Sequence, residues 1–416
     1  MSEFLTLLSP GDALSRLLHA MPQQSPIRSE RLPTSSALGR VLAEAVRAPI
    51  PLPPFARSSV DGFAVRASDT FGASPSLPAY LLVTGEVPMG AAPSLVIVAG
   101  QAALIHTGGM LPDGADAVVM VEDVQVVREG EIEVFKAAAP GQNVLLQGED
   151  VAQGEIVVEA GVRLRAQEIG GLIALGVTEV EVARRPRVAI LSTGDELVPP
   201  EAAPNPGQVR DVNSYTLSAL IQAAGGEPIR YGILPDRLET IVTAAVQARE
   251  SSDLVVLTAG SSVSTRDMTA EVLNRLGEPG VLVHGVALKP GKPTILGLAD
   301  GVPVVGLPGN PVSAIVVARL FVIPLLQRLS GAARRLPAPS IMARIGTNIA
   351  SEAGREDFIP VRLELDAKGW RAEPVHGRSN LIFPLVRADG LVRIPSEATG
   401  VAPGSQVEVE LFDPLT

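Results

Sequence analysis

Cysteine is absent from the 416-residue sequence. Its absence excludes disulfides, thiolate metal sites and a cysteine nucleophile. Basic residues are also scarce, because 34 lysines and arginines stand against 45 aspartates and glutamates and give a formal net charge of −11. A nucleic-acid partner is not expected, since its phosphates require a basic surface. An anionic ligand would have to be met by a local cluster of cations.

Long apolar runs are missing as well. The two longest, 95–105 and 314–326, are short for a membrane span, and Arg319 and Pro324 interrupt the second. The first residues carry neither the basic start nor the apolar run of a signal peptide. We therefore expect a soluble, cytoplasmic protein that has no membrane partner.

Common sequence fingerprints of ligand sites are also lacking. No G-x-G-x-x-G dinucleotide motif follows the first strand of the predicted α/β region, and no G-x-x-x-x-G-K-[ST] phosphate loop occurs. The four histidines, at positions 19, 106, 284 and 376, are scattered without metal-ligand spacing, so we interpret each as structural.

The patterns that are present divide the chain into several domains, as expected for its length. A helix start at Ser9-Pro-Gly-Asp12 opens a first region, and a similar pattern returns at 140–182. Residues 1–50 and 140–182 therefore form one discontinuous domain. Between them, 51–139 contains short Val/Ile/Leu runs separated by glycine, proline and aspartate, which predicts an inserted β-rich domain.

Residues 183–330 have a different rhythm, because strand-like and helix-like segments alternate. Strands are predicted at 188–191, 228–233, 254–257 and 302–305, with Asn213, Asp236 and Asp267 capping the helices between them. Alternation of this kind predicts a parallel sheet with helices on both faces. Ligands of such folds bind beyond the carboxyl ends of the strands.

Polar residues follow these strand ends. The first strand leads into Thr193-Gly194-Asp195-Glu196, the second into Asp236, and the third into a loop that ends at Asp267. Two further loops, Lys289-Pro-Gly-Lys292-Pro and Leu307-Pro308-Gly309-Asn310-Pro311, bracket the strand run 294–298. Glycine loops with lysines bind anions, and carboxylates beside them fit a magnesium-bridged phosphate.

Each of these residues also has a plainer interpretation. Asp236 and Asp267 could serve only as helix caps, and Glu196 only as a solvated turn residue. The two lysines could be solvated side chains of ordinary turns. The functional interpretation is favoured because carboxylates, hydroxyls, glycines and lysines meet at one edge of one sheet.

Six segments together resemble the molybdopterin molybdenumtransferase family, called MoeA in bacteria and represented in animals by the C-terminal domain of gephyrin. The resemblance covers essentially the whole chain. Its markers are Ser59-Val-Asp-Gly-Phe-Ala-Val65, Thr107-Gly-Gly with Ala117-Val-Val-Met-Val-Glu122, Ser192-Thr-Gly-Asp-Glu-Leu197, Asp211-Val-Asn213, Lys289-Pro-Gly-Lys-Pro293 and Leu307-Pro-Gly-Asn-Pro-Val-Ser313.

The resemblance implies that the discontinuous domain is elongated, that 183–330 is a molybdopterin-binding α/β domain similar to MogA, and that 335–416 forms a C-terminal β-barrel. It implies a homodimer that takes adenylylated molybdopterin and molybdate, uses Mg²⁺ or another divalent cation, and releases AMP. Further partners would be the molybdopterin adenylyltransferase and molybdoenzyme apoproteins.

Roles can be carried over residue by residue. The resemblance implies that Asp61 and Thr107 face the cleft and that Glu196, Asp236 and Asp267 hold the cation, orient water or contact the nucleotide. Lys289 and Lys292 would meet molybdate or the pyrophosphate. Substrate would be bound by Thr193, Gly194, Asp195, Asp211, Gly260, Ser262, Pro308, Gly309, Asn310, Pro311, Arg355 and Ser379.

One position departs from the family pattern, because Ala259 stands where many relatives have glycine. This change affects only the detailed nucleotide contacts of that loop. Two other functions fit parts of the pattern. One is adenylyl transfer from ATP to molybdopterin, which belongs to single-domain relatives of the α/β region. The other is a non-catalytic scaffold like gephyrin, which would not require an intact rim of carboxylates and lysines.

Overall fold

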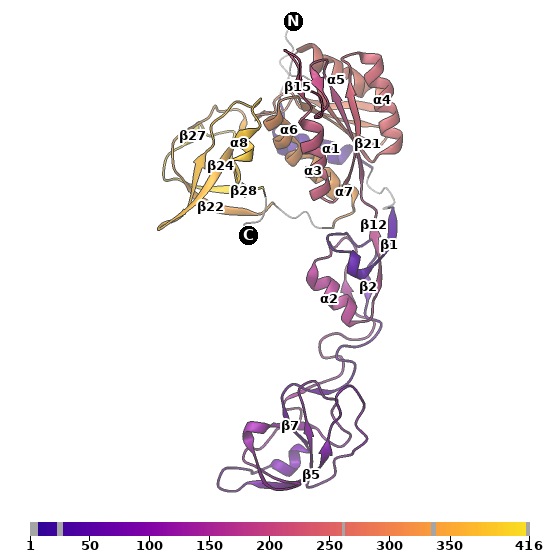
Figure 1. The fold of residues 1–416 in the computed structure, drawn as a ribbon, viewed down its shortest axis with the longest axis vertical. Coiled ribbons are helices and arrows are strands. Elements are labelled where there is room, and N and C mark those ends of the chain that lie inside the picture. Colours follow the sequence, from indigo (N-terminus) through magenta and orange to yellow (C-terminus); the bar gives the residue numbers. More distant parts are fainter. Residues whose placement is uncertain (1–6, 23–27, 260–262, 334–337, 413–416) are drawn as a thin grey trace.

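The computed structural model describes residues 7–22, 28–259, 263–333 and 338–412, without the side chains of 263–266. Figure 1 shows four units along an elongated molecule: the inserted domain at one end, the elongated domain in the middle, and the α/β domain and the barrel at the other end. This arrangement confirms the predicted fold class.

The elongated domain consists of short paired strands and one helix. Strand β1 (Ser29–Pro33) pairs antiparallel with β12 (Glu179–Ala183), and β2 (Val46–Arg47) pairs with β11 (Ile156–Val158). A 3-10 turn, η1 (Thr34–Ser36), and helix α2 (Ala166–Ala174) complete it. Its small core is formed by Ala37, Leu42, Leu164, Leu172, Val180 and Val182.

Helix α1 (Pro10–Ala20) begins as the sequence predicts, with the Ser9 hydroxyl accepting a hydrogen bond from the Asp12 amide and proline in the first turn. Its apolar face does not belong to the elongated domain, although residues 1–50 were grouped there. Ala13 and Leu17 are buried in the core of the α/β domain. An amphipathic pattern predicts that one helix face is buried but does not identify the surface that buries it.

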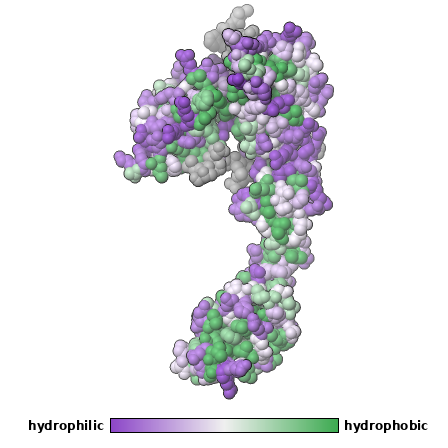
Figure 2. All heavy atoms as spheres, in the orientation of Figure 1, coloured by the Kyte–Doolittle hydropathy of each residue, from purple (hydrophilic) through white to green (hydrophobic). Residues whose placement is uncertain are grey.

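The inserted domain contains a six-stranded sheet in the order β7-β4-β6-β5-β9-β8. Its strands and turns are β4 (Gly62–Val65), η2 (Ala67–Thr70), β5 (Ala79–Glu86), β6 (Gln101–Ile105), β7 (Ala117–Met120), η3 (Val121–Asp123), β8 (Val124–Arg128) and β9 (Glu131–Val134). The chain enters through β3 (Arg57–Ser58) and leaves through β10 (Val144–Leu145), which pair antiparallel. Several large apolar side chains of this domain are exposed (Figure 2), among them Phe71, Leu77, Tyr80, Leu82 and Val126.

The α/β domain is built on a six-stranded sheet in the order β16-β13-β17-β21-β20-β18. Its strands are β13 (Arg187–Thr193), β16 (Glu227–Leu234), β17 (Leu254–Ala259), β18 (Pro279–His284), β20 (Ile295–Ala299) and β21 (Val302–Pro308). Two short strands, β14 (Leu197–Val198) and β15 (Val209–Arg210), pair beside it. Helices α4 (Leu238–Ser251) and α5 (Val263–Leu276) pack on one face, and α1 and α3 (Asn213–Ala223) pack on the other.

The sheet is mixed rather than wholly parallel. Strands β16, β13, β17 and β21 are parallel, whereas β20 is antiparallel to both β21 and β18. The reason is a two-residue turn, because Asp300 and Gly301 both have positive φ angles, 50° and 88°, and join β20 to β21 as a hairpin.

The helical segment Pro311–Leu329 is long and apolar enough to cross a membrane, with a mean hydropathy of 1.8. It consists of α6 (Pro311–Val317), a π-helical stretch η4 (Ala318–Val322) and α7 (Ile323–Leu329). More than half of its most apolar stretch is buried, and Phe321, Val322 and Leu325 are fully enclosed in the α/β core. The segment packs as a core helix does.

The C-terminal domain closes into a five-stranded barrel in the order β24-β25-β22-β28-β26, with β26 returning to β24. Its elements are β22 (Ser340–Ile345), β23 (Ile349–Ala350), β24 (Glu356–Asp366), β25 (Gly369–Pro374), α8 (Phe383–Val386), β26 (Gly390–Ile394), β27 (Gly400–Val401) and β28 (Gln406–Leu411). Phe358, Leu385 and Leu391 join the core of the α/β domain, so the two domains are packed together.

Candidate functional site

Carboxylates gather where β13 and β16 end. The two strands are parallel neighbours, and Thr193 lies opposite Leu234 in their register. The residues that follow therefore meet: the Asp236 backbone amide donates to the Asp195 carboxylate at 3.2 Å. The predicted grouping of Asp195, Glu196 and Asp236 at one sheet edge is confirmed.

Gly194 allows the Glu196 side chain to fold back over the strand end. A Cβ atom at Gly194 would lie 2.7 Å from a Glu196 carboxylate oxygen, closer than real Cβ contacts occur. The Gly194 amide meanwhile donates to the Leu234 carbonyl at 3.2 Å, which ties this turn to β16. Glycine at this position thus determines where the Glu196 carboxylate can lie.

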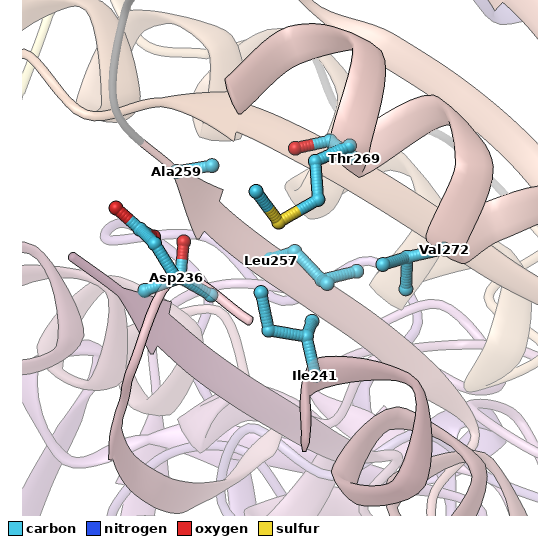
Figure 3. Close-up of a pocket in the computed structure, with 8 residues that line it drawn as sticks. Asp236, Ile241, Leu257, Ala259, Thr269 and Val272 are labelled. Carbon is cyan, nitrogen blue, oxygen red and sulfur yellow. The ribbon is translucent and has the colours of Figure 1, made fainter. Parts of the chain in front are cut away.

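Asp236 borders a narrow, mostly apolar pocket (Figure 3). Asp236, Ala259 and Thr269 lie toward one end of it, and Ile241 and Val272 toward the other. Burial raises the pKa of Asp236, and the nearby charges of Asp195 and Glu196 raise it further, while a hydrogen bond from the Thr193 hydroxyl partly offsets them. The Oδ1 atom of Asp236 is buried and has no hydrogen-bond partner among the described residues.

Helix caps differ from the prediction at all three positions. The Asp211 carboxylate accepts from the Ser214 amide at 3.1 Å and so caps α3, in place of Asn213. No side chain caps α4, whose first residue is Leu238, and Asp236 instead faces the site. Asp267 is an exposed residue in the second turn of α5 and lies inside the helix. Gly260 and Ser262, both predicted to bind substrate, lie outside the described residues.

The loop Pro308–Pro311 is held between two domains. The Asn213 side-chain amide donates to the Gly309 carbonyl at 2.8 Å from the α/β domain. The Asn310 side-chain amide donates to the Ser379 hydroxyl at 3.2 Å, and the Val312 amide donates to the Ser379 carbonyl at 3.2 Å. Ser379 of the barrel domain therefore contacts the loop that borders the site, and its role in binding substrate stays a prediction.

These elements enclose a cavity of about 590 Å³. Its walls come from the ends of β13, β17 and β21, from the loop before α3, and from the barrel domain. The lining residues are Thr193, Glu196, Leu197, Pro204, Gln208, Val209, Arg210, Asp211, Val212, Asn213, Thr258, Ala259, Gly309, Asn310, Pro311, Asn380 and Ile382. Such a volume accommodates a small organic ligand.

The lysine loop lies at the other end of the same sheet edge. Strand β19 (Leu288–Lys289) pairs parallel with β24 of the barrel and places Lys289 opposite Asp357. The Lys289 Nζ atom lies 3.9 Å from Asp357, and the Arg355 Nε atom donates to Asp357 at 2.9 Å. Lys292 is exposed three residues further on.

Gly291 permits the close packing of this loop. Its φ angle is 125°, and a Cβ atom there would come within 2.5 Å of both the Leu288 and Val317 side chains. The loop is therefore pressed against helix α6, and its conformation is fixed by the α/β core. Lys289 and Lys292 project from a rigid support.

The carboxylates and the lysine loop lie well apart. From β13, through β17 and β21, to β20 there are three strand spacings, or about 14 Å. A single small anion cannot contact both ends. A ligand that uses the whole edge must be extended, with separate groups for the carboxylate end and for the cationic end.

Asp61 and Thr107 meet in the inserted domain, far from this edge (Figure 1). The Asp61 carboxylate accepts from the Thr107 amide at 2.7 Å and from its hydroxyl at 3.1 Å. These two hydrogen bonds, with a smaller contribution from His106, lower the pKa of Asp61. The His106 ring also contacts Glu86 at 3.0 Å.

Residues that could hold a divalent cation can be judged from the carboxylate end. Within the described part of the chain, no three acidic or histidine side chains form a ready-made ligand group. However, burial and then the charges of Asp195 and Glu196 raise the pKa of Asp236, and a bound cation would offset these effects. The carboxylate end thus fits a cation that is shared with an anionic ligand.

Several residues at this site are not predicted from the sequence. Pro204, Gln208, Val209 and Arg210 line the cavity before α3, and Asn380 and Ile382 line it from the barrel domain. Asp357 lies between Lys289 and Arg355. The only available signal for Asp357 is its position next to a predicted site residue in Gly354-Arg-Glu-Asp-Phe358. Its contacts depend on a pairing between residues almost seventy positions apart.

Comparisons with known proteins cover the same regions. Three family models match the chain: the MoeA N-terminal region (domain I and II) at residues 8–176, a probable molybdopterin binding domain at 189–328, and the MoeA C-terminal region (domain IV) at 342–412. The chain is 33% identical to a molybdopterin molybdenumtransferase of Haemophilus influenzae, over 98% of this chain and 100% of that protein.

Two other relatives agree with these matches. A molybdopterin molybdenumtransferase of a Nostoc species is 33% identical over 90% of this chain and 86% of its own length. A crystal structure of the molybdopterin biosynthesis MoeA protein from Pyrococcus horikoshii superposes with a TM-score of 0.85 at 33% identity, covering 98% of this chain and 100% of that chain.

Proposed function

The chain belongs to the molybdopterin molybdenumtransferase family, and we propose that it inserts molybdenum into adenylylated molybdopterin. The reaction takes molybdate and the adenylate, and it releases AMP and molybdenum cofactor. One observation carries the proposal: the carboxylates and the lysine loop occupy opposite ends of one sheet edge, and the strands that lead into them are three strand spacings, or about 14 Å, apart. That span suits an extended ligand with a pyrophosphate at its centre.

The residues can be assigned to parts of this chemistry. Cleaving the pyrophosphate link with water breaks the bridging P–O bond of one phosphate and joins that phosphorus to the water oxygen, which loses a proton; the products carry their negative charge on phosphate oxygens. Lys289, Lys292 and Arg355 offset negative charge at one end of the ligand. Lining groups of the 590 Å³ cavity, such as Asn213 and Asn310, can orient the ligand by hydrogen bonds.

A divalent cation, Mg²⁺ in the simplest case, would be held by Glu196 and Asp236, with Asp267 contributing from α5. When bound, the cation supplies positive charge to the phosphate oxygens. The pKa of Asp236 is raised by burial first and then by the charges of Asp195 and Glu196, and a cation would offset both effects, which supports this assignment. Thr193 and Gly194 keep these carboxylates at the strand end.

A homodimer would complete the site. Asp61 and Thr107 lie in the inserted domain, which the elongated domain separates from the α/β cleft of the same chain (Figure 1). A second copy could bring its Asp61 and Thr107 to that cleft. The exposed apolar side chains of the inserted domain, such as Leu77 and Leu82, suit a contact of this kind. We place the enzyme in the cytoplasm, where it would receive substrate from the adenylyltransferase and deliver cofactor to molybdoenzyme apoproteins.

The test is an assay of AMP release from adenylylated molybdopterin. We expect release to require both molybdate and a divalent cation, and to fall to background in excess chelator. Re-addition of Mg²⁺ should restore it, which controls for damage by the chelator. Release that continues unchanged in chelator would remove the cation from the proposal.

The sister activity, adenylyl transfer from ATP to free molybdopterin, is the nearest alternative. The contacts of Ser379 and Asn380 with the cleft count against it, because a single-domain adenylyltransferase has no barrel domain. Formation of adenylylated molybdopterin from ATP in the same assay would favour this alternative. A scaffold without enzymatic activity predicts no AMP release under any condition.

A further inference from the structure

Asp357 is a buried carboxylate that the proposed reaction does not yet use. Its side chain is 0% exposed. Oδ1 accepts from the Arg355 Nε atom at 2.9 Å, whereas Oδ2 is buried and has no hydrogen-bond partner among the described residues. The Lys289 Nζ atom lies 3.9 Å from Oδ2, and the Lys289 side chain is 58% exposed. One buried anion therefore faces two cations.

The fold places these three residues together from two domains. Lys289 pairs with Asp357 where β19 joins β24, and the Glu356 amide donates to the Ala287 carbonyl at 2.9 Å. Side chains alternate along β24, so the adjacent Glu356 points the other way and binds Arg393 at 2.6 Å. Glu356 and Asp357 are thus consecutive buried carboxylates on opposite sides of the strand, and Asp357 is the one that approaches the lysine loop.

Burying a carboxylate is unfavourable unless cations and hydrogen bonds compensate it. The hydrogen bond to Arg355 uses only the Oδ1 atom of Asp357, so it does not explain why Oδ2 is buried as well. The Oδ2 atom of Asp357 lies 3.9 Å from the Lys289 Nζ atom, which is beyond hydrogen-bonding distance. It attracts the ammonium group without a direct hydrogen bond, so the group remains available to a ligand in the cleft.

We propose that Asp357 is a positioning residue that holds Lys289 and Arg355 together at the cleft, where the pair receives an oxyanion of the molybdate or phosphate class. The inference rests on the proposed function of this site. Without Asp357 the two cations repel each other, and Lys289 loses the buried anion beside its ammonium group, while Arg355 keeps its ion pair with Glu352 at 2.9 Å. The anion must then hold Lys289 in place when it binds, which weakens its binding.

The experiment measures the molybdate concentration that gives half-maximal AMP release. For Asp357→Asn we expect this concentration to rise about tenfold, while kcat stays within about twofold. The reason is that Asp357 holds the cations in place for binding molybdate but takes no part in the chemical step. Glu356→Gln is the matched control: it removes the neighbouring buried carboxylate on the same strand, so it should affect stability but leave the molybdate concentration unchanged.

A double-mutant cycle with Lys289→Ala separates the possible results. Lys289→Ala alone should raise the half-maximal concentration, and adding Asp357→Asn to it should have a much smaller effect than in the wild type. Equal effects in both backgrounds would overturn positioning through Lys289. A wild-type enzyme whose AMP release ignores molybdate would instead refute the proposed function itself.

A second measurement needs no variant at Asp357, in case that protein does not fold. Competitive acetylation of the wild-type enzyme compares Lys289 with the exposed Lys292. We expect slower modification of Lys289 because its ammonium group is held against Asp357, and we expect molybdate to protect both lysines. Equal rates for the two lysines without molybdate would contradict the proposal.

Discussion

At the α/β cleft, polar side chains from several strand ends and from a second domain meet around one cavity, whereas in the inserted domain Asp61 and Thr107 meet on an open surface. Each region pairs an aspartate with a threonine hydroxyl, yet the shifts are opposite. The pKa of Asp61 is lowered by hydrogen bonds from Thr107, and the pKa of Asp236 is raised by burial and by Asp195 and Glu196. The surroundings of the two side chains therefore make the Asp61 carboxyl easier to ionise than the Asp236 carboxyl.

The difference suggests a division of labour. Asp61 is 63% exposed and holds its charge without a cation. The buried Oδ1 atom of Asp236 has no hydrogen-bond partner among the described residues, and the carboxylates of Asp195 and Glu196 lie nearby. A hydrogen-bond donor or a cation would therefore stabilise the charge of Asp236. We propose that a ligand or cation supplies positive charge at the α/β cleft, whereas the inserted domain contributes a carboxylate whose charge is already stabilised by hydrogen bonds.

The largest expected effect tests whether the two regions act across subunits. Asp61→Ala and Glu196→Ala homodimers should each lose about 100-fold or more of AMP release. Mixing the two variants through unfolding and refolding should restore roughly a quarter of wild-type activity, because half of the dimers are mixed and each has one intact site.

Each variant refolded alone is the control, and exchange of subunits must be shown by tagging one of them. A mixture that forms heterodimers but stays as inactive as its parents would show that the cleft is built within one chain. The inserted domain of one subunit would then not complete the α/β cleft of the other.

An intermediate effect is expected when the two threonine hydroxyls are removed. Thr193→Val takes away the bond that lowers the pKa of Asp236, so the acidic limb of the pH–rate profile should move to higher pH. Thr107→Val should reduce kcat/KM several-fold without moving that limb, because the Thr107 amide still donates to Asp61. Profiles of AMP release across pH measure both, and identical shifts in the two variants would refute the assignment.

The smallest effect concerns stability. Because the pKa of Asp236 is raised in the folded state, the folded chain binds more protons between the usual value of 3.8 and the raised value, and stability falls as pH rises through that window. Asp236→Asn should therefore raise the Tm of the transition that contains the α/β domain by about 1–2 °C at neutral pH, allowing for solvent screening. Calorimetry measures the change.

Asp61→Asn is the matched variant for this measurement. The folded-state pKa of Asp61 is lowered, so its charge favours folding above the usual value and the amide should not raise Tm. A rise in Tm for both variants would show that net charge, rather than the local environment of Asp236, controls stability.

Much of the cleft could be predicted from the sequence because strand ends and turn residues are local signals. Thr193, Glu196 and Asp236 follow apolar runs, and parallel order brings them together. The antiparallel β20 also had a local signal, since Asp300-Gly301 is a typical hairpin turn. The shift of the α3 cap from Asn213 to Asp211 reflects two short polar side chains that compete for one helix start.

Other features depend on contacts that no local pattern records. Strand β19 has two residues, and its pairing with β24 brings Asp357 to Lys289 across almost seventy positions. The burial of α1 against the α/β core likewise depends on which apolar surface is free to receive it. The sequence near Asp357 therefore gives no sign that its side chain is fully buried.

The paired strands β3 and β10 have a consequence for how the molecule unfolds. Val144 pairs with Ser58 and Leu145 with Arg57, so the chain enters and leaves the inserted domain side by side. The two cores of that domain consist of residues between Val60 and Val144, so they lie within the inserted segment itself. Heating should thus produce separate calorimetric transitions rather than one. A short linker that replaces the inserted domain between β3 and β10 would close at little entropic cost, and cation binding to the α/β cleft could then be titrated without that domain.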